Sequence, residues 1–173
     1  MASAVKLFPS GVRFDVVGYG CTSGSAVIGA DRVAELVRAG CETRHVTNPL
    51  SALVAACRTQ EIKSLSILSP YVEPVSEHLR RVLADEGIET PVFGSFNIGV
   101  EGVVARITDR SIVEAAMALD RGPETDAIFL SCTNLQTLDV IPRLEQALGK
   151  PVLSSNAVLA WHMKSLAGLC PLS

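Results

Sequence analysis

The stretch DAIFLSCT (residues 126–133) is an apolar run that ends in a cysteine and a threonine. A second stretch, DVVGYGCT (residues 15–22), repeats the pattern of an aspartate, five mostly apolar or small residues, and Cys-Thr. A short apolar run bounded by small polar residues is typical of a buried strand. We therefore predict that Cys21 and Cys132 each lie directly after a buried strand.

The rest of the chain alternates between short apolar runs and amphipathic stretches. The expected strands cover residues 14–20, 42–47, 64–70, 90–97, 126–131 and 150–155, and the expected helices cover 30–40, 49–60, 75–87, 109–120, 140–149 and 157–168. This order predicts an α/β fold with parallel sheets and right-handed crossovers. Ligands bind such sheets beyond the carboxyl ends of the strands. Cys21, Tyr71, Asn97 and Cys132 all follow expected strands, so we expect these four residues at a ligand site.

The similarity between the two cysteine stretches extends further along the chain. Cys21 lies 27 residues before Asn48, and Cys132 lies 24 residues before Asn156, with a helix and a strand expected in between. An internal repeat of this kind predicts two similar α/β lobes that face each other across a cleft. Chance similarity between two buried strands is the alternative explanation.

The composition argues against several classes of partner. The 173 residues are 48% hydrophobic and 19% charged, which fits a globular α/β protein with a sizeable core. A net charge of -3 and an aromatic content of 5% give no basis for binding nucleic acid or an anionic membrane. No apolar run reaches the roughly 18–20 residues that span a bilayer, and the N-terminus lacks the apolar segment of a signal peptide.

The five cysteines are odd in number, and none forms a Cys-x-x-Cys pair. This pattern predicts neither a zinc site nor a disulfide scaffold, and a reducing cytoplasm is the expected setting. Cys41, Cys57 and Cys170 are expected to be structural, because cysteine is among the residue types most often buried. The sequence also has no P-loop, dinucleotide fingerprint or HExxH motif, so we expect a mechanism without a cofactor.

Two facing thiols suggest proton-transfer or nucleophilic chemistry. Because a helix is expected after each cysteine, helix N–H groups and the helix dipole are predicted to favour both thiolates. One thiol could remove a proton from a substrate carbon while the other replaces it on the opposite face, or one could add covalently to a double bond. Thr22, Ser23, Thr133 and nearby backbone N–H groups could donate hydrogen bonds to the developing oxyanion.

Three segments carry a resemblance to a known family: GYGCTSGSAVIG, SPYVEPVSEHL and LSCTNLQTLDVIPRLEQALGKPVLSSNAVLAWH. In this order they resemble the aspartate/glutamate racemase superfamily. The resemblance is to the branch that holds maleate cis-trans isomerase, arylmalonate decarboxylase and the racemase-like proteins of ectoine utilisation. It implies two pseudo-symmetric lobes, with parallel sheets flanked by helices and the active site in the cleft between them.

The resemblance also implies roles for single residues. Cys21 matches the first catalytic cysteine, which is the nucleophile in maleate isomerases, and Cys132 matches the second, which carries the proton. The substrate-binding positions that match are Tyr71, which holds a carboxylate or enolate oxygen, Asn97 in the cleft, and the hydroxyl donors Thr22 and Ser23. Each of these also has a local explanation: Tyr71 could cap a strand, Asn97 could form a turn, and Thr22 and Ser23 could cap a helix.

We therefore expect a cofactor-independent isomerase or racemase that acts on a small carboxylate or dicarboxylate. Arylmalonate decarboxylases carry glycine at the position of Cys21, so a cysteine pair favours isomerisation or racemisation over decarboxylation alone. An arylmalonate decarboxylase-like lyase and a truncated, non-catalytic relative that binds small acids are the alternatives.

Besides the cysteine at position 21, where arylmalonate decarboxylases carry glycine, the chain departs from the family pattern in a second way. Only 20 residues precede Cys21, where family members have a further βαβα-sized segment. We expect a first lobe of residues 1–58 plus 160–173, incomplete at its N-terminus, and a second lobe of residues 59–159. An apolar, incomplete lobe would also be compatible with a homodimer or a higher homo-oligomer.

Overall fold

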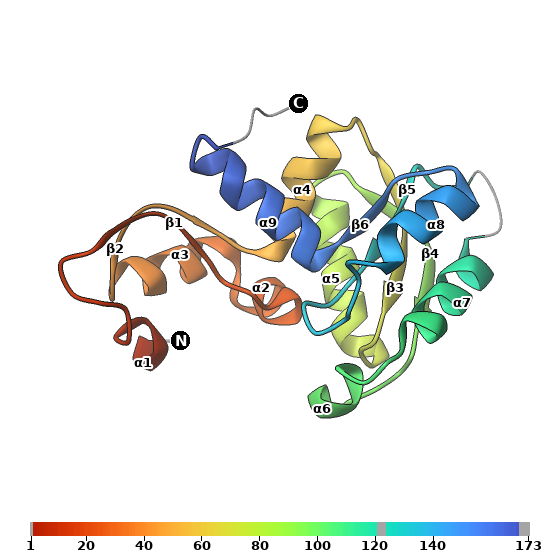
Figure 1. The fold of residues 1–173 in the computed structure, drawn as a ribbon, viewed down its shortest axis with the longest axis horizontal. Coiled ribbons are helices and arrows are strands. Elements are labelled where there is room, and N and C mark those ends of the chain that lie inside the picture. The colour runs from red at the N-terminus through yellow and green to blue at the C-terminus, as the bar shows by residue number, and fades with distance from the viewer. Residues whose placement is uncertain (1, 121–123, 170–173) are drawn as a thin grey trace.

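The computed structural model describes residues 2–120 and 124–169 (Figure 1). The strands are β1 (Arg13–Gly18), β2 (Glu42–Thr47), β3 (Ser64–Ser69), β4 (Glu89–Ser95), β5 (Ala127–Leu130) and β6 (Val152–Ser154). The longer helices are α3 (Ala30–Arg38), α4 (Pro49–Thr59), α5 (Glu73–Asp85), α7 (Asp109–Leu119), α8 (Val140–Leu148) and α9 (Ser155–Leu166). Each predicted strand and helix is present, with ends within two residues of the prediction.

Three short helices have bounds that the sequence did not predict: α1 (Ala2–Val5), α2 (Thr22–Ile28) and α6 (Glu101–Val104). Within the described part of the chain, no helix has both the length and the apolar character needed to cross a membrane. Cys170, expected to be structural, lies outside the described residues.

The strands form two separate sheets, and all of their pairings are parallel. β1 and β2 form one sheet, and the other has the order β4-β3-β5-β6. A parallel pair needs a crossover connection, which the alternating helices supply. The predicted α/β fold with parallel sheets flanked by helices is therefore confirmed.

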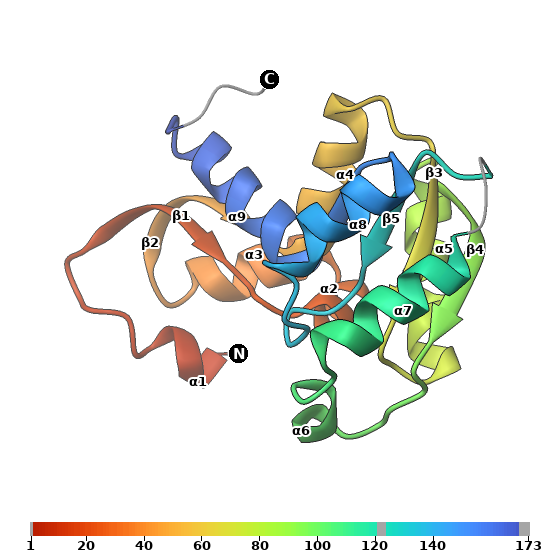
Figure 2. The ribbon, with the colours of Figure 1, turned by 45° about the vertical axis from the view of Figure 1, so that its right-hand side comes forward.

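The four-stranded sheet is covered on both faces (Figures 1 and 2). Ile67 and Phe129 pack in one apolar cluster with side chains of α4 and α5, while Leu68 and Leu130 pack in another with side chains of α7 and α8. Alternate residues of a strand point to opposite faces, so these strands need apolar residues at nearly every position. The unbroken apolar run 127–130 is explained by this two-sided burial.

The two-stranded sheet packs against α3 and α9. Val33 and Val37 of α3 cluster with Val17 of β1, and α9 contacts β1, β2 and α4. A Cβ atom on Gly18 would lie 2.6 Å from the Met163 sulfur, so any side chain at this position would have to displace the Met163 side chain of α9. Glycine at this position allows the close approach of α9 to β1.

The predicted division into lobes 1–58 plus 160–173 and 59–159 follows the two sheets only partly. α4 precedes the boundary, yet Leu53 of α4 belongs to the same apolar cluster as Leu65 of β3. The division therefore stays a prediction.

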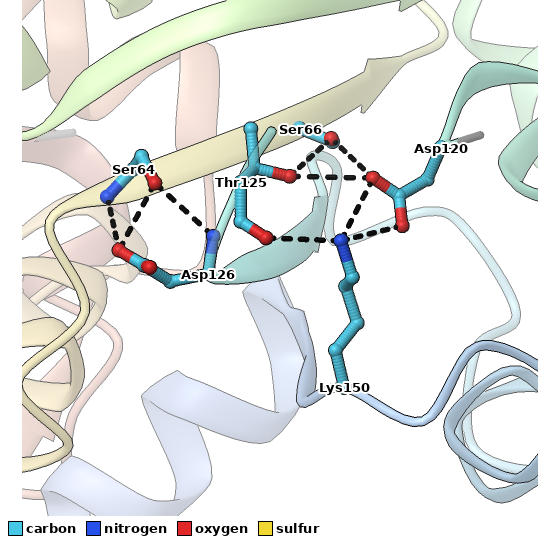
Figure 3. A network of polar contacts seen from close by, with 6 residues as sticks. All are labelled: Ser64, Ser66, Asp120, Thr125, Asp126 and Lys150. Atoms are coloured by element: carbon cyan, nitrogen blue, oxygen red, sulfur yellow. Dashed lines mark hydrogen bonds and ion pairs between the residues drawn. The ribbon is translucent and has the colours of Figure 1, made fainter. Parts of the chain in front are cut away.

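A polar network joins β3 and β5 at their amino ends (Figure 3). The buried Asp120 carboxylate forms an ion pair with Lys150 at 2.9 Å and accepts hydrogen bonds from two hydroxyls. Asp126 accepts the Lys63 N–H at 2.8 Å and the Ser64 N–H at 2.9 Å, and the hydrogen bonds from Lys63 and then from Ser64 lower the pKa of the Asp126 carboxyl. The network comprises Ser64, Ser66, Asp120, Thr125, Asp126 and Lys150. These contacts hold the two strands in register at the edge opposite to the cysteines.

Candidate active site

Cys21 lies where β1 gives way to α2. Tyr19 N–H donates to the Thr47 carbonyl at 2.9 Å, which extends the contact between the strands beyond the end of β1. Cys21 is the N-cap of α2, and its half-buried sulfur accepts the Gly24 N–H at 3.3 Å. A short helix therefore follows Cys21 directly, closer to it than the predicted helix at residues 30–40.

Cys132 follows β5 in a different setting. Ser131 N–H donates to the Leu68 carbonyl at 2.9 Å, and the next residue is Cys132, only 1% exposed. The next helix, α8, begins at Val140, so the prediction that a helix N-terminus favours the Cys132 thiolate is wrong. The sulfur instead accepts the Asn134 N–H of the loop at 3.2 Å.

The two cysteine loops touch each other. The Thr133 hydroxyl, next to Cys132, donates to the carbonyl of Gly20, next to Cys21, at 3.0 Å. Asn156, at the start of α9, donates to the Thr133 carbonyl at 3.0 Å. The two Cys-Thr stretches, 111 positions apart in the sequence, are therefore neighbours in the fold.

Tyr71 contacts Cys132 directly. Its hydroxyl lies 2.8 Å from the Cys132 sulfur, and the backbone of Tyr71 is held by the side chains of Ser69 and Ser95 at the ends of β3 and β4. Burial first, and then the hydrogen bond with Cys132, raise the pKa of the Tyr71 hydroxyl far above its usual value. Tyr71 is therefore a neutral hydrogen-bond donor at physiological pH.

The pKa of Cys132 is raised, and the main cause is burial of the thiol. Hydrogen bonds from Tyr71 and from the Asn134 N–H act in the opposite direction, while the negative charge of Glu101 adds to the increase. The sequence predicted a favoured thiolate. Burial reverses that expectation, because a charged sulfur loses more solvation than the loop donors replace.

Ser23 links the surroundings of the two cysteines. Its hydroxyl lies 3.7 Å from the Cys21 sulfur, within hydrogen-bond range for sulfur. A hydrogen bond with Ser23 also lowers the pKa of Tyr71, against the larger effects that raise it. Ser23 and Tyr71 therefore form a path of polar groups between the two thiols.

A cavity of about 450 Å³ opens beside this path. It has a polar side made by Ser23, Tyr71 and the acidic Glu101, and the rest of its wall is apolar or glycine. Glu101 accepts a hydrogen bond from the Asn134 side chain at 2.6 Å. The lining residues are Ser23, Gly24, Val27, Ile28, Tyr71, Val72, Val75, Ile98, Gly99, Glu101 and Val104. Such a cavity can hold a small molecule with one polar and one apolar end.

Three other predicted site residues, Thr22, Thr133 and Asn97, do not line this cavity. Thr22 is 1% exposed and its hydroxyl donates to Ser155 at 2.8 Å, whereas the Thr133 hydroxyl is engaged by the Gly20 carbonyl. Asn97 is exposed, with a φ of 54° and its N–H bonded to Ser95, which is the geometry of a turn. Its neighbours Ile98 and Gly99 line the cavity. The binding roles of Thr22, Thr133 and Asn97 stay predictions.

The sequence reasoning did not single out Tyr19 and Glu101. Tyr19 lies two residues before Cys21, and its hydroxyl contacts that thiol. Glu101 follows a glycine-containing loop, and nothing local to its sequence indicates that it faces Tyr71 and Cys132. Among the described residues, no three His, Cys, Asp or Glu side chains cluster so as to hold a metal ion.

Comparisons with known proteins agree on one group of enzymes. A family model described as arylmalonate decarboxylase matches residues 2–173. The arylmalonate decarboxylase of Bordetella bronchiseptica is 34% identical over 125 residues, which are 70% of this chain and 51% of that protein. The chain therefore spans about half the length of that curated relative.

Solved structures give the same result. A crystal structure of arylmalonate decarboxylase matches with a TM-score of 0.77 and 29% identity, over 88% of this chain and 68% of the other. The maleate isomerase Iso of Pseudomonas putida S16 matches with a TM-score of 0.81 and 25% identity, over 90% of this chain and 65% of the other.

Proposed function

Since the chain belongs to the arylmalonate decarboxylase family, we propose that it isomerises or racemises a small carboxylate through Cys21 and Cys132, without a cofactor. The proteins it is similar to are enzymes, namely arylmalonate decarboxylase and maleate isomerase. The choice between their reactions, and the substrate, belong to this proposal.

The meeting of the two cysteine loops carries the proposal. The Thr133 hydroxyl joins the loops at 3.0 Å, and the Tyr71 hydroxyl lies 2.8 Å from the Cys132 sulfur beside the cavity. A two-thiol reaction needs both sulfurs near one substrate carbon and a donor for the oxygen that gains charge. Tyr71 and Ser23 are suited to be that donor, because both line the cavity.

The two thiols suit different roles in racemisation. The Cys21 thiolate would remove the proton on the substrate α-carbon, and the electron pair of the broken C–H bond would move into the carboxylate as an enediolate. Cys132, whose raised pKa keeps it protonated, would give its proton to the opposite face of that carbon. Turnover would leave Cys21 as thiol and Cys132 as thiolate, ready for the mirror-image substrate or for proton exchange with water.

In the isomerisation of an unsaturated diacid, Cys21 would form a carbon–sulfur bond to one alkene carbon. The electron pair of the double bond would move to the other carbon, where the adjacent carboxylate and a proton from Cys132 stabilise it. After rotation, Cys132 would take the proton back and the carbon–sulfur bond would break. The same two residues therefore serve both reactions.

Decarboxylation is the second candidate, and the apolar wall of the cavity favours it. Val27, Val72 and Val75 line the cavity and could hold an apolar substituent of a malonate. One carbon–carbon bond would break, carbon dioxide would leave, and Cys132 would protonate the carbon that keeps the electron pair. This reaction does not need Cys21.

Deuterium exchange tests the leading proposal. We expect incorporation at the α-carbon of 2-substituted carboxylic acids in heavy water, and its loss in both Cys21→Ser and Cys132→Ser. For isomerisation, mass spectrometry should find a maleate adduct on Cys21. Exchange that survives both substitutions would exclude a two-thiol mechanism. Carbon dioxide release from a substituted malonate that persists in Cys21→Gly and stops in Cys132→Ser would instead establish decarboxylation.

A further inference from the structure

Tyr19 places its hydroxyl against the thiol of Cys21. The two groups converge over Gly24: a Cβ atom built on Gly24 would lie 2.5 Å from the Tyr19 hydroxyl oxygen and 3.0 Å from the Cys21 sulfur. The absence of a side chain at Gly24 leaves the space in which they meet. The phenol oxygen and the thiol sulfur therefore approach each other over Gly24, and, after burial, the nearby thiol contributes to the raised pKa of Tyr19.

The backbone and the ring hold Tyr19 in this position. Tyr19 N–H donates to the Thr47 carbonyl at 2.9 Å, and the Tyr19 carbonyl accepts the Cys21 N–H at 3.0 Å. The ring packs against the apolar cluster of Val17, Val33 and Val37. A phenol anchored at both backbone and ring loses little further freedom when its hydroxyl donates a hydrogen bond.

The chemistry of the pair favours donation from oxygen to sulfur. Burial, and then the charge of Cys21 and the hydrogen bond with it, raise the pKa of Tyr19, so its hydroxyl keeps its proton. A protonated phenol is a donor, and a thiolate is a better acceptor than a thiol. Cys132 has the equivalent partner in Tyr71, so each cysteine has its own tyrosine.

We propose that Tyr19 is a positioning residue for Cys21: the Tyr19 hydroxyl donates a hydrogen bond to the Cys21 sulfur and makes that sulfur more reactive. This inference rests on the proposed function for its catalytic meaning. The effect on the Cys21 thiol can be measured without any substrate, so this inference and the proposed function can fail separately.

The test is the alkylation rate of Cys21 in the full chain by iodoacetamide between pH 6 and pH 8, resolved by peptide mass spectrometry. Tyr19→Phe keeps the ring and removes the hydroxyl. Loss of a hydrogen bond to a charged group changes a pKa by about one unit or more, and the reactivity of a thiol changes less steeply than its thiolate fraction. We therefore expect Cys21 to react roughly threefold to tenfold more slowly in Tyr19→Phe than in the unsubstituted chain. Circular dichroism should show an unchanged fold.

Tyr71→Phe is the matched control, because it removes the other phenol hydroxyl and should leave the labelling of Cys21 unchanged. An unchanged Cys21 rate and pH profile in Tyr19→Phe would overturn the inference and leave Tyr19 a packing residue. An equal decrease in both variants would also overturn it, because the effect would then not belong to the Tyr19 hydroxyl. If the labelling result holds but no α-proton exchange is found, only the proposed function fails.

Discussion

The loops that carry Cys21 and Cys132 follow the same Asp-x5-Cys-Thr pattern, yet they hold their thiols differently. Cys21 is half-buried, caps a short helix and lies beside the Tyr19 hydroxyl. Cys132 is 1% exposed, lies in a loop eight residues before the next helix and contacts Tyr71. One sequence pattern therefore produces two chemical environments, and burial makes the difference.

This difference suggests a division of tasks between the thiols. A buried sulfur with a raised pKa keeps a proton until a substrate carbanion takes it. The half-buried sulfur of Cys21 is easier for a substrate or reagent to reach. Substitutions at the two thiols and at the residues around them test this division.

The strongest test is the double variant of the two cysteines. Cys21→Ser and Cys132→Ser should each reduce racemisation or isomerisation on the order of 10³-fold, and the double variant should be little worse than either, because the two groups act as a unit. Steady-state turnover of the three variants measures this. Losses that simply multiply would show that the thiols act independently.

The next test removes the donor beside Cys132. Tyr71→Phe should lower turnover on the order of 10²-fold, as expected for loss of an oxyanion donor. Because the Tyr71 hydrogen bond lowers the pKa of Cys132, its removal should also move alkylation of Cys132 to higher pH. Turnover equal to that of the unsubstituted chain would remove Tyr71 from the reaction.

A smaller effect is expected at Glu101. The negative charge of Glu101 raises the pKa of Cys132, so Glu101→Gln should lower that pKa. Alkylation of Cys132 at pH 7.5 should then be roughly twofold to fivefold faster, because solvent and salt partly screen the charge that is removed. Glutamine can still accept the Asn134 hydrogen bond, so the geometry is kept. Cys21 labelling is the internal control. A slower Cys132 would contradict the sign of the Glu101 effect.

The smallest effect is expected where the loops touch. Thr133→Val removes the hydrogen bond to the Gly20 carbonyl and should reduce the free energy of unfolding by about 1 kcal/mol. Urea denaturation measures this loss, and Thr133→Ser is the control that keeps the hydroxyl. Equal stability of the valine and serine variants would mean that the contact does not hold the loops together.

Most of the fold could be predicted from the sequence because apolar periodicity and helix caps are local signals. The strand at residues 42–47 is as predicted, and Asn48 and Thr108 cap their helices with side-chain hydrogen bonds. Helix α2 was harder to delimit, since Gly24 and two serines within it are weak helix formers.

The site was predictable only where residues follow strands directly. Tyr71 and Cys132 lie together because β3 and β5 are neighbouring parallel strands whose carboxyl ends share one edge. Cys21 follows β1 of the other sheet, and the contact between its loop and the Cys132 loop runs from Thr133 to Gly20. The protonation of Cys132 could not be predicted, since its burial depends on residues from several elements. Glu101 comes near Cys132 through a tertiary contact with Asn134 that no spacing in the sequence reveals. Tyr19 lies only two residues before Cys21, but the direction of its hydroxyl depends on the packing of its ring.

The polar network at the amino ends of β3 and β5 has a consequence for protein engineering. Asp120 and Asp126 fix the register of these strands at one edge of the sheet, whereas Tyr71 and Cys132 lie beyond the other edge. The loops that carry Tyr71 and Cys132 can therefore be exchanged for loops of related proteins without removing the contacts that align the strands. The chain is a suitable scaffold for grafting new loops onto one end of a sheet.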